Sequence, residues 1–267
     1  VGFYDPETNE LRAVEHDGLV GIAYQHRTSR AGDPQLHTHV VIANRVRCEG
    51  RWLTIDSRGH HDSAKAVGAR YQAALRAELE TRLGVEFGEV TEHAQAEVVG
   101  VPDELTAGWS SRSREVDAAL AEWLGEFRAS EGRDPDPDEW RKAKQAAVLA
   151  TRPAKDTDGD AATTETLRDR WRAEAEAAGI DVDALVGEAT GRTQSRPDQR
   201  GHVTPEWFLT QVERERATWQ DKDARIEAAR WTHGAQTAAE AGANIDAWTA
   251  AAVAHPSVER FGDVDED

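Results

Sequence analysis

The sequence is poor in cysteine, lacks methionine and has no long apolar run. Its single cysteine, Cys48, excludes an internal disulfide and a multi-cysteine zinc site, and an unpaired thiol suits a reducing compartment. No stretch approaches the roughly 18 consecutive apolar residues of a membrane span, and the N-terminus carries no basic-then-apolar leader. These absences predict a cytoplasmic protein. Because the chain begins with Val and contains no Met, we also expect it to be a piece of a longer protein or the product of a damaged reading frame.

The chain is also short of basic residues, which taken alone argues against a nucleic acid partner. Its formal net charge is −18 over 267 residues, whereas phosphate contacts need Lys and Arg. The charge is distributed unevenly, however. Residues 19–84 contain ten Lys or Arg and six Asp or Glu, a net charge of +4, which leaves −22 for the rest. This local excess is either composition bias or the footprint of a DNA contact.

Short apolar runs predict an antiparallel sheet. We expect strands at 19–24, 40–43 and 51–55. Gly32 and the turn-forming pair Asp33-Pro34 interrupt the connection between the first two strands. The two strands should therefore pair through a loop that is longer than a tight hairpin turn.

The rest of the chain is mainly helical by its apolar period. A first helix is expected over 63–83, with Asp62 or Ser63 as its cap and Gly84 after its end, and 59–61 before it as a polar loop. Its apolar positions are Val67, Tyr71, Leu75, Leu79 and Leu83. The later segments are short strands at 85–90 and 95–99, helices at 116–127, 140–150, 167–178 and 207–229, an Ala-rich helical end, and polar connections at 132–138, 156–164, 187–201 and 262–267. The predicted fold class is α/β of the α+β kind, an antiparallel sheet with packed helices followed by a mostly helical C-terminal region.

Three histidines stand in one short segment. His37 and His39 alternate along an expected strand and so point to one face, and His26 ends the strand before it. If the two strands pair, three imidazoles converge. That is the pattern of a metal site with three protein ligands and positions left for substrate. The alternative is two surface histidines beside a buried one.

The residues around these histidines resemble a known family. Residues 24–44 read YQHRTSRAGDPQLHTHVVIAN, and the pattern continues through 50–58 into the expected helix. This stretch resembles the metal-site motif of MobF-class (TrwC/TraI-like) conjugative relaxases, which are three-histidine (HUH) endonucleases. The similarity is strong over 19–84 and weaker over 151–178.

The resemblance implies DNA-nicking chemistry at a metal centre. Such relaxases cut one strand of plasmid DNA at an origin of transfer, using a tyrosine that becomes attached to the 5′ end and a divalent ion held by three histidines. By this resemblance His26, His37 and His39 bind the ion. Imidazoles are neutral ligands, so the ion keeps its charge for the phosphate. Zn²⁺, Mn²⁺, nickel or copper suit three imidazoles, and Mg²⁺ stays open because phosphate adds oxygen ligands.

Neighbouring charged residues receive roles by the same resemblance. The candidates for phosphate contact are Arg27, Arg30, Lys65 and Lys155, with Arg70 assigned instead to a solvated helix face. For Arg27 and Arg30 the alternative role is to keep the loop soluble. Asp33 is expected to orient a histidine or to shape the loop.

The resemblance also divides the chain into regions and suggests partners. Residues 1–155 are expected to be the C-terminal part of a relaxase (HUH) domain, 156–186 its helical extension, and 187–267 a linker and a helical region of unassigned role. The partners implied are single-stranded DNA at the origin of transfer, a downstream helicase in the full-length protein, and other conjugation proteins. No GxxxxGK[ST] phosphate-binding loop occurs in the chain itself.

The chain departs from the family pattern in its tyrosines. The family's nucleophile lies well before the histidine motif, and only 25 residues precede His26 here. Tyr24 and Tyr71 fall on an expected strand and helix, where we predict core positions, and Tyr4 falls in an expected loop. We therefore expect no catalytic residue within the chain, a nucleophilic tyrosine upstream of it, and an inactive fragment when it stands alone. An incomplete sheet is expected to leave unpaired edges and an exposed core face.

Three other functions stay open. The chain could be a non-catalytic remnant that binds single-stranded DNA, or a replication-initiator-type HUH endonuclease that shares the same chemistry. It could also be an unrelated metallohydrolase in which water attacks. That last function needs a carboxylate base, for which Asp33 and Asp56 are the nearby candidates.

Overall fold

The structure is a computed structural model. It describes residues 2–5, 10–13, 17–48, 50–55, 58–152, 163–191, 204–214, 218–232 and 235–258. Most of the predicted connections at 156–164 and 187–201 and the acidic tail at 262–267 lie outside the described residues, as do Lys155 and Asp56.

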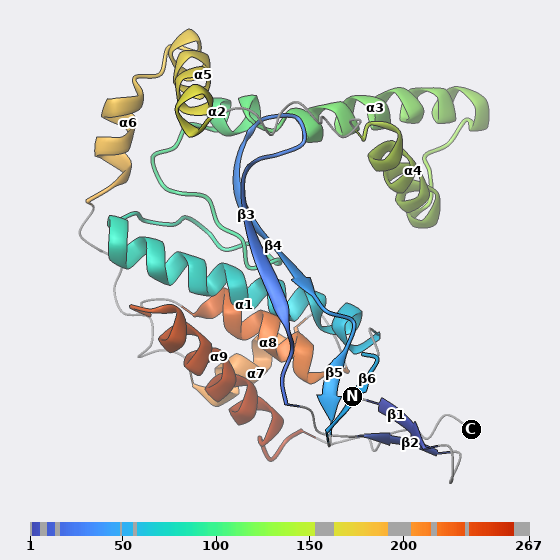
Figure 1. Ribbon diagram of the computed structural model, residues 1–267. Coiled ribbons are helices and arrows are strands. Elements are labelled where there is room, and N and C mark those ends of the chain that lie inside the picture. The colour runs from blue at the N-terminus through green and yellow to red at the C-terminus, as the bar shows by residue number, and fades with distance from the viewer. Residues whose placement is uncertain are drawn as a thin grey trace. The chain divides into compact units, whose positions relative to one another are not determined.

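Helices make up most of the described chain, and the strands form short antiparallel pairs (Figure 1). The strands are β1 (Gly2–Asp5), β2 (Glu10–Ala13), β3 (Gly21–Thr28), β4 (Pro34–Ile42), β5 (Val46–Cys48) and β6 (Arg51–Leu53), and each pairs with its neighbour in sequence: β1 with β2, β3 with β4, β5 with β6. The helices are α1 (Arg58–Leu83), α2 (Asp103–Gly108), α3 (Ser111–Glu131), α4 (Pro137–Ala150), α5 (Thr164–Ala177), α6 (Val182–Ala189), α7 (Pro205–Glu213), α8 (Asp221–Trp231) and α9 (Ala238–Val253). The predicted α+β class with a mostly helical C-terminal region is confirmed.

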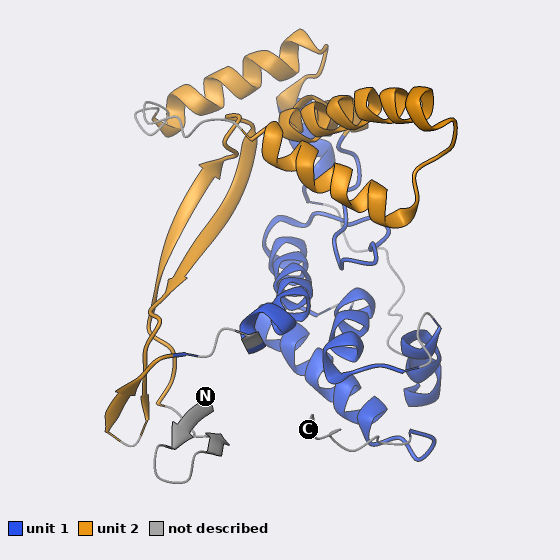
Figure 2. Cartoon of the chain, turned by 90° about the vertical axis from the view of Figure 1, so that its right-hand side faces the viewer, with its two compact units in different colours: residues 1–14, 55–101, 183–267 blue, residues 15–54, 102–182 orange. Residues whose placement is uncertain are grey.

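The chain divides into two compact units (Figure 2). The first unit comprises Val1–Val14, Ile55–Val101 and Asp183–Asp267, and the second comprises Glu15–Thr54 and Pro102–Val182. The histidine strands β3 and β4 belong to the second unit, and α1 with the C-terminal helices belongs to the first. The three-part domain division expected from the family resemblance stays a prediction.

In the second unit, β3 and β4 form a hairpin whose register decides which side chains share a face. His26 pairs with His37, and Tyr24 pairs with His39. Directly opposed residues of antiparallel strands point to the same side of the sheet, so these four side chains share one face. The register shifts between His26 and Thr28, where a β-bulge lies. The predicted pairing through a loop longer than a tight turn is confirmed.

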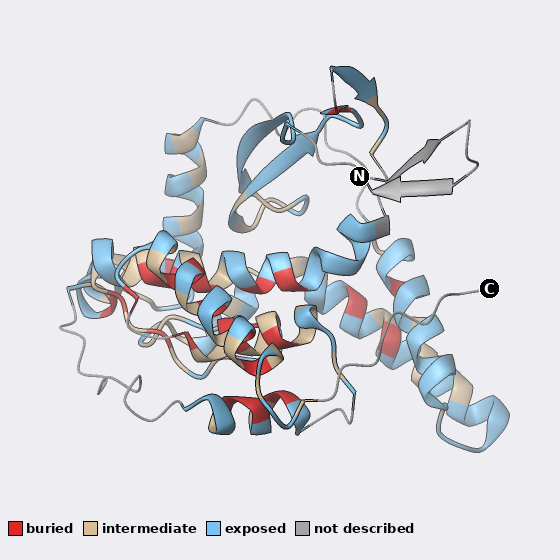
Figure 3. Ribbon diagram, turned by 90° about the horizontal axis from the view of Figure 1, so that it is seen from below, coloured by how far each residue is buried: buried red, intermediate tan, exposed pale blue. Residues whose placement is uncertain are grey.

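Apolar side chains on both faces of this hairpin are exposed to solvent, and Figure 3 shows the hairpin coloured largely as exposed. Tyr24 is 49% exposed on the histidine face, and Val40 and Leu36 are 62% and 79% exposed on the opposite face. Strands that are apolar on both sides are typical of sheets that are covered on both sides. The predicted core position of Tyr24 is wrong for this chain, because half of the side chain is exposed.

The core of the first unit lies between α1 and the helices α7, α8 and α9, which pack against one another (Figure 1). Ala69 and Ala73 on one face of α1 are small enough to let α8 and α9 approach closely. Phe208 of α7 and Ile245 of α9 fill the centre at 1% exposure each. The C-terminal helices therefore complete the core on which α1 packs.

Polar contacts also tie α1 to these helices. The Arg70 guanidinium donates to both carboxylate oxygens of Asp246 in α9, at 2.8 and 3.1 Å, and Arg225 of α8 donates to the same carboxylate at 2.7 Å. The buried Arg76 donates to the backbone carbonyl of Ala229 at 2.8 Å. Arg70 is exposed, as predicted for a solvated helix face, and its charge is in addition paired with Asp246 of α9.

The predicted apolar stripe of α1 does not form this core. Val67, Tyr71 and Leu75 are exposed, Tyr71 by 52%. At 100° per residue they lie on the side of the helix opposite to Ala69 and Ala73. The predicted core position of Tyr71 is therefore wrong for this chain.

The start of α1 is also earlier than predicted. The helix begins at Arg58 instead of residue 63, so His60 and His61 lie in its first two turns and not in a polar loop. The prediction followed the apolar period, and a polar first turn has no apolar residue to reveal it.

Two later boundaries differ as well. The predicted strands between residues 85 and 99 reduce to a single bridge between Phe87 and Val98. The predicted helix over 207–229 is two helices, α7 and α8, and Gln220 begins the second one with a capping box. A capping box satisfies the free amides at the start of a helix. A second helix can therefore begin within a segment whose apolar residues follow one continuous helical period.

Helices α3 and α4 form a helical hairpin in the second unit. Val116 and Leu120 of α3 pack on Ala147 of α4. Asp136 caps α4 by accepting hydrogen bonds from the amides of the next turn, at 2.9 and 2.8 Å. Across the described helices, none combines the length and the apolar content needed to cross a membrane.

Candidate metal centre

Three imidazoles converge on the histidine face of the β3–β4 hairpin. The ring centroids lie 5.3 Å apart for His26 and His37, 4.8 Å for His26 and His39, and 4.9 Å for His37 and His39. One ring nitrogen of each residue can be chosen so that all three lie within 4.8 Å of one another. The predicted convergence of the three side chains is confirmed.

Strand alternation and register bring these rings together. His37 and His39 are two residues apart on β4, so both point to the same face. His26 on β3 is directly opposite His37. The register shifts after His26, and a β-bulge of this kind generally bends a strand and increases its twist.

The backbone sets the tautomer of His37. Its Nδ1 lies 2.9 Å from the carbonyl oxygen of Gln35. A carbonyl only accepts, so Nδ1 carries the hydrogen and Nε2 keeps its lone pair. This Nε2 lies 3.2 Å from Nε2 of His39. Proteins usually orient a metal-binding imidazole by a hydrogen bond from the ring nitrogen that does not bind the metal, which for His37 would be Nδ1.

The donor set fits a divalent cation with three protein ligands. Among the described residues the group consists of three imidazoles and no carboxylate. Imidazole binds a metal as a neutral ligand, so this set would leave the full charge of an ion for a substrate. His26 and His39 are exposed and His37 is half-buried. The site is therefore open on one side, as a catalytic metal site must be and a structural one need not be.

Asp33 shapes the loop between the two histidine strands. Its Oδ1 accepts from the Ser111 hydroxyl at 2.8 Å, and its Oδ2 accepts from the Ser111 amide at 3.1 Å and the Ser29 hydroxyl at 3.3 Å. Of the two roles predicted for Asp33, loop shaping is the one in the structure. Because both oxygens are engaged, Asp33 is a poor base for a hydrolytic water. Ser111 escaped the sequence reasoning because it lies 78 residues away.

The basic candidates fall in different parts of the chain. Arg27 and Arg30 are exposed on the histidine hairpin, and within the described residues neither guanidinium has a hydrogen-bond or ion-pair partner. Lys65 is an exposed residue of α1 in the first unit. Lys155 lies outside the described residues.

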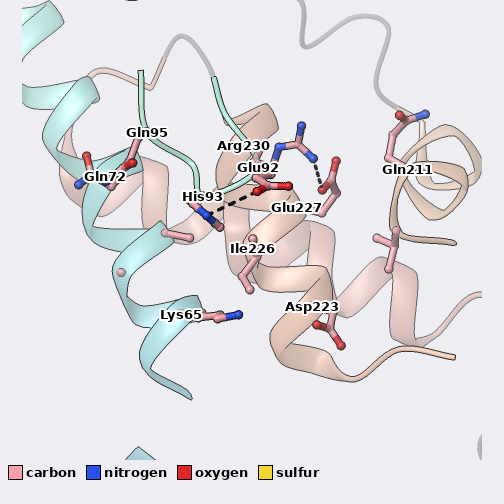
Figure 4. Close-up of a pocket in the computed structure, with 13 residues that line it drawn as sticks. Lys65, Gln72, Glu92, His93, Gln95, Gln211, Asp223, Ile226, Glu227 and Arg230 are labelled. Atoms are coloured by element: carbon pink, nitrogen blue, oxygen red, sulfur yellow. Dashed lines mark hydrogen bonds and ion pairs between the residues drawn. The ribbon is translucent and has the colours of Figure 1, made fainter. Parts of the chain in front are cut away.

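The first unit contains a hollow of about 470 Å³ between α1, α7, α8 and the segment around His93 (Figure 4). Its charges are largely paired with one another: His93 lies 3.5 Å from Glu92, and Arg230 donates to Glu227 at 2.9 Å. No Ser, Thr, Cys or Tyr lines it. Among the described residues, this hollow therefore has no hydroxyl or thiol nucleophile and lacks the three-imidazole set of the hairpin.

The tyrosines are distributed over both units. Tyr24 shares the histidine face, opposite His39, whereas Tyr71 lies on α1 in the first unit. Tyr4 lies in β1, paired with Leu11 of β2, so its predicted place in a loop is wrong.

The sequence and the fold of this chain are similar to those of conjugation proteins. A family profile for the TrwC relaxase matches residues 5–178. The multifunctional conjugation protein TraI of Escherichia coli is 32% identical over 192 residues, which are 68% of this chain and 10% of that protein. TraI of Escherichia coli strain K12 is 34% identical over 136 residues, which are 48% and 7%. The chain thus spans a tenth or less of the length of these curated relatives.

Solved structures agree. The conjugative relaxase TrwC in complex with mutant oriT DNA is similar with a TM-score of 0.53 and 30% identity, over 67% of this chain and 59% of that one. The metal-bound structure of TrwC with oriT DNA is similar with a TM-score of 0.51 and 28% identity, over 67% and 58%. The match over residues 5–178 covers more than half of the chain, and together with the histidine hairpin it shows that the chain belongs to the TrwC relaxase family.

Proposed function

We propose that this chain carries the metal centre of a conjugative relaxase, which nicks one strand of plasmid DNA at the origin of transfer, and that the nucleophilic tyrosine comes from residues outside the chain. The observation that carries the proposal is the open cluster of His26, His37 and His39 within 4.8 Å. The relative TrwC has been solved with oriT DNA in a metal-bound form, which supports both the DNA and the metal.

Nicking is a transesterification at phosphorus. The tyrosine oxygen loses its proton and bonds to phosphorus, the bond from phosphorus to the 3′ oxygen breaks, and that oxygen leaves as a hydroxyl after taking up a proton. When bound, the divalent ion supplies Lewis acidity and stabilises the charge that builds on the non-bridging oxygens. The residues of this chain hold and orient the ion: three neutral rings bind it, and the Gln35 carbonyl fixes the ring of His37. Mg²⁺, Mn²⁺ and Zn²⁺ are the candidate ions.

Two uncovered apolar faces support a nucleophile from outside the chain. The β3–β4 hairpin exposes apolar residues on both sides, and α1 exposes the stripe of Val67, Tyr71 and Leu75. Burying one such side chain stabilises a protein by about 1.5–3 kcal/mol, so faces of this size are costly in water. We infer that these faces are covered in the intact relaxase, and that elements outside this chain bring the tyrosine. The chain covers 59% of the solved TrwC chain, which leaves room for such elements.

The partners follow from the same proposal. Single-stranded oriT DNA contacts Arg27 and Arg30 beside the histidines, with Lys65 and Lys155 as weaker contacts. In the full-length protein a helicase and other conjugation proteins act together with the relaxase portion, in the cytoplasm. The division into 1–155, 156–186 and 187–267 belongs to this proposal.

A covalent adduct assay tests the function. The chain is incubated with a single-stranded oriT oligonucleotide and Mg²⁺ or Mn²⁺, alone or co-expressed with the polypeptide encoded in frame upstream, and adducts are read on a denaturing gel. We expect none from the chain alone and an adduct from the completed protein. His37→Ala should abolish that adduct, and His93→Ala, which removes an exposed histidine of the first unit, should not.

The assay also separates the alternatives. A histidine-dependent adduct from the chain alone, lost in Tyr24→Phe or Tyr4→Phe, would locate the nucleophile within these residues and refute an outside tyrosine. Oligonucleotide binding without an adduct in the completed protein would favour the non-catalytic DNA-binding remnant. Cleavage without a covalent adduct would favour water as the nucleophile, and preference for a replication origin would favour the initiator.

A further inference from the structure

The loop that joins the two histidine strands is closed by its own hydrogen bonds. The Ser29 amide donates to the Asp33 carbonyl at 2.9 Å, and the Gly32 amide donates to the Ser29 carbonyl at 3.0 Å. The Ser29 hydroxyl accepts from the amides of Ala31 and Asp33, both at 3.2 Å. Gly32 has a φ of +85°, which residues with a Cβ rarely adopt. The loop is thus a defined turn.

Asp33 also serves as the cap of a distant helix. The residue before α3, Ser110, makes no side-chain capping bond, and the first turn of α3 contains no acidic residue. The free amides of a helix N-terminus need acceptors and carry partial positive charge. Asp33 supplies both an acceptor and a negative charge through its two bonds to Ser111.

Helix α5 holds the same turn at the neighbouring residue. The Arg170 guanidinium donates to the Gly32 carbonyl, and the Trp171 indole N–H donates to it at 3.1 Å. Two helices of the second unit therefore hold two consecutive residues of the turn.

The contacts of Gly32 and Asp33 with α3 and α5, here called the clamp, lie next to the residue pairs that set the register of the histidines. Thr28 pairs with Pro34, the residue after Asp33, and the bulge separates this pair from the pair of His26 and His37. A slip of one residue in the pairing register of a strand moves every one of its side chains to the opposite face. Such a slip would remove the bulge and take His26 away from the face of the other two rings.

We propose that Asp33, acting through Ser111, is a positioning residue that holds the three imidazoles in register for the metal. The inference rests on the metal centre of the proposed function. It assigns no contact between Asp33 and the ion or the DNA.

Metal affinity of the whole 267-residue chain tests this apart from stability. The variant is Asp33→Ala, and the matched control is Asp136→Ala, which removes a carboxylate cap of similar geometry from α4 in the same unit. Co²⁺ is titrated while its d–d absorption is recorded, because that spectrum reports the number and geometry of the ligands. We expect both variants to lower Tm, and only Asp33→Ala to weaken Co²⁺ binding, by about tenfold or more, with a changed spectrum. Asp33→Asn keeps an acceptor for the Ser111 amide and should restore most of the affinity.

Any other result of the Co²⁺ titration refutes either the positioning role of Asp33 or the metal centre itself. Wild-type affinity and spectrum in Asp33→Ala overturn the positioning role, and equal weakening in Asp136→Ala overturns it too, since the effect would then follow general stability. A wild-type chain that binds no Co²⁺ refutes the metal centre and this inference together. Failure of the nicking proposal is read separately, because Co²⁺ binding needs neither DNA nor tyrosine.

Discussion

Replacing Phe208 by Ala tests whether the C-terminal helices and α1 form one cooperative unit. The Phe208 ring is 1% exposed, packs in one cluster with Ala69 and Ala73 of α1, and lies 5.8 Å from the ring of Trp248. Removing a buried Phe side chain costs about 3–5 kcal/mol, because the cavity closes only in part. Since α1 contributes mainly alanines to this core, it has little buried apolar area with which to stay folded alone. We expect α1 to lose stability together with α7–α9.

Amide hydrogen exchange read by mass spectrometry measures this directly. Peptides from α1 and α8 should exchange faster by the same factor, roughly a hundredfold for about 3 kcal/mol, if global opening of the unit controls exchange. The matched control is Phe127→Ala in α3, where the ring is only partly buried and lies 5.1 Å from Trp123. It should leave α1 unchanged. Wild-type protection of α1 in Phe208→Ala would show two independent folding units and refute the shared core.

Three further predictions concern pH, metal and DNA. Arg70 holds the pKa of Asp246 below its ordinary value of 3.8. The stability that this pair contributes is therefore complete above pH 3.8 and is lost as the pH falls through the lower pKa of the folded state. The Tm difference between wild type and Asp246→Asn should shrink in that acid range, and a constant difference would contradict the assignment. A divalent metal at a hundred times its Kd should stabilise the wild-type chain by about 2.7 kcal/mol in thermal melts and leave His39→Ala unchanged, whereas an equal shift in both would place the metal elsewhere. Arg27→Ala and Arg30→Ala should each weaken binding to single-stranded DNA and lower the salt slope of the affinity by about 0.7, and an unchanged slope would remove that residue from the DNA contact.

The convergence of the three histidines could be predicted from the sequence because it depends on local rules. Two histidines at alternate positions share a face of any strand, and a third at the end of the preceding strand meets them once the strands pair. The segment between them contains Gly32 and Asp33-Pro34, which favour a turn. No long-range contact is needed for that inference, and the confirmed convergence of the rings follows from it.

The clamp on the loop could not be predicted in the same way. Asp33 and Ser111 are 78 residues apart, and Arg70 and Asp246 are 176 apart. Each of these four polar residues looks like an ordinary solvated side chain in the sequence. Only the packing of helices against a hairpin or against one another gives them partners, and no local pattern encodes which partner.

Burial was predicted least well, and α1 illustrates the reason. An apolar stripe indicates a face that is meant to be covered, but not what covers it. The stripe of Val67, Tyr71 and Leu75 is exposed, while the opposite face, with Ala69 and Ala73, packs on α8 and α9. Alanines permit close helix packing, and the large side chains on the other face provide the apolar area that a second layer requires. A helix with two apolar faces of different size is suited to lie between two layers, and the sequence pattern alone does not identify the segment that forms the second layer.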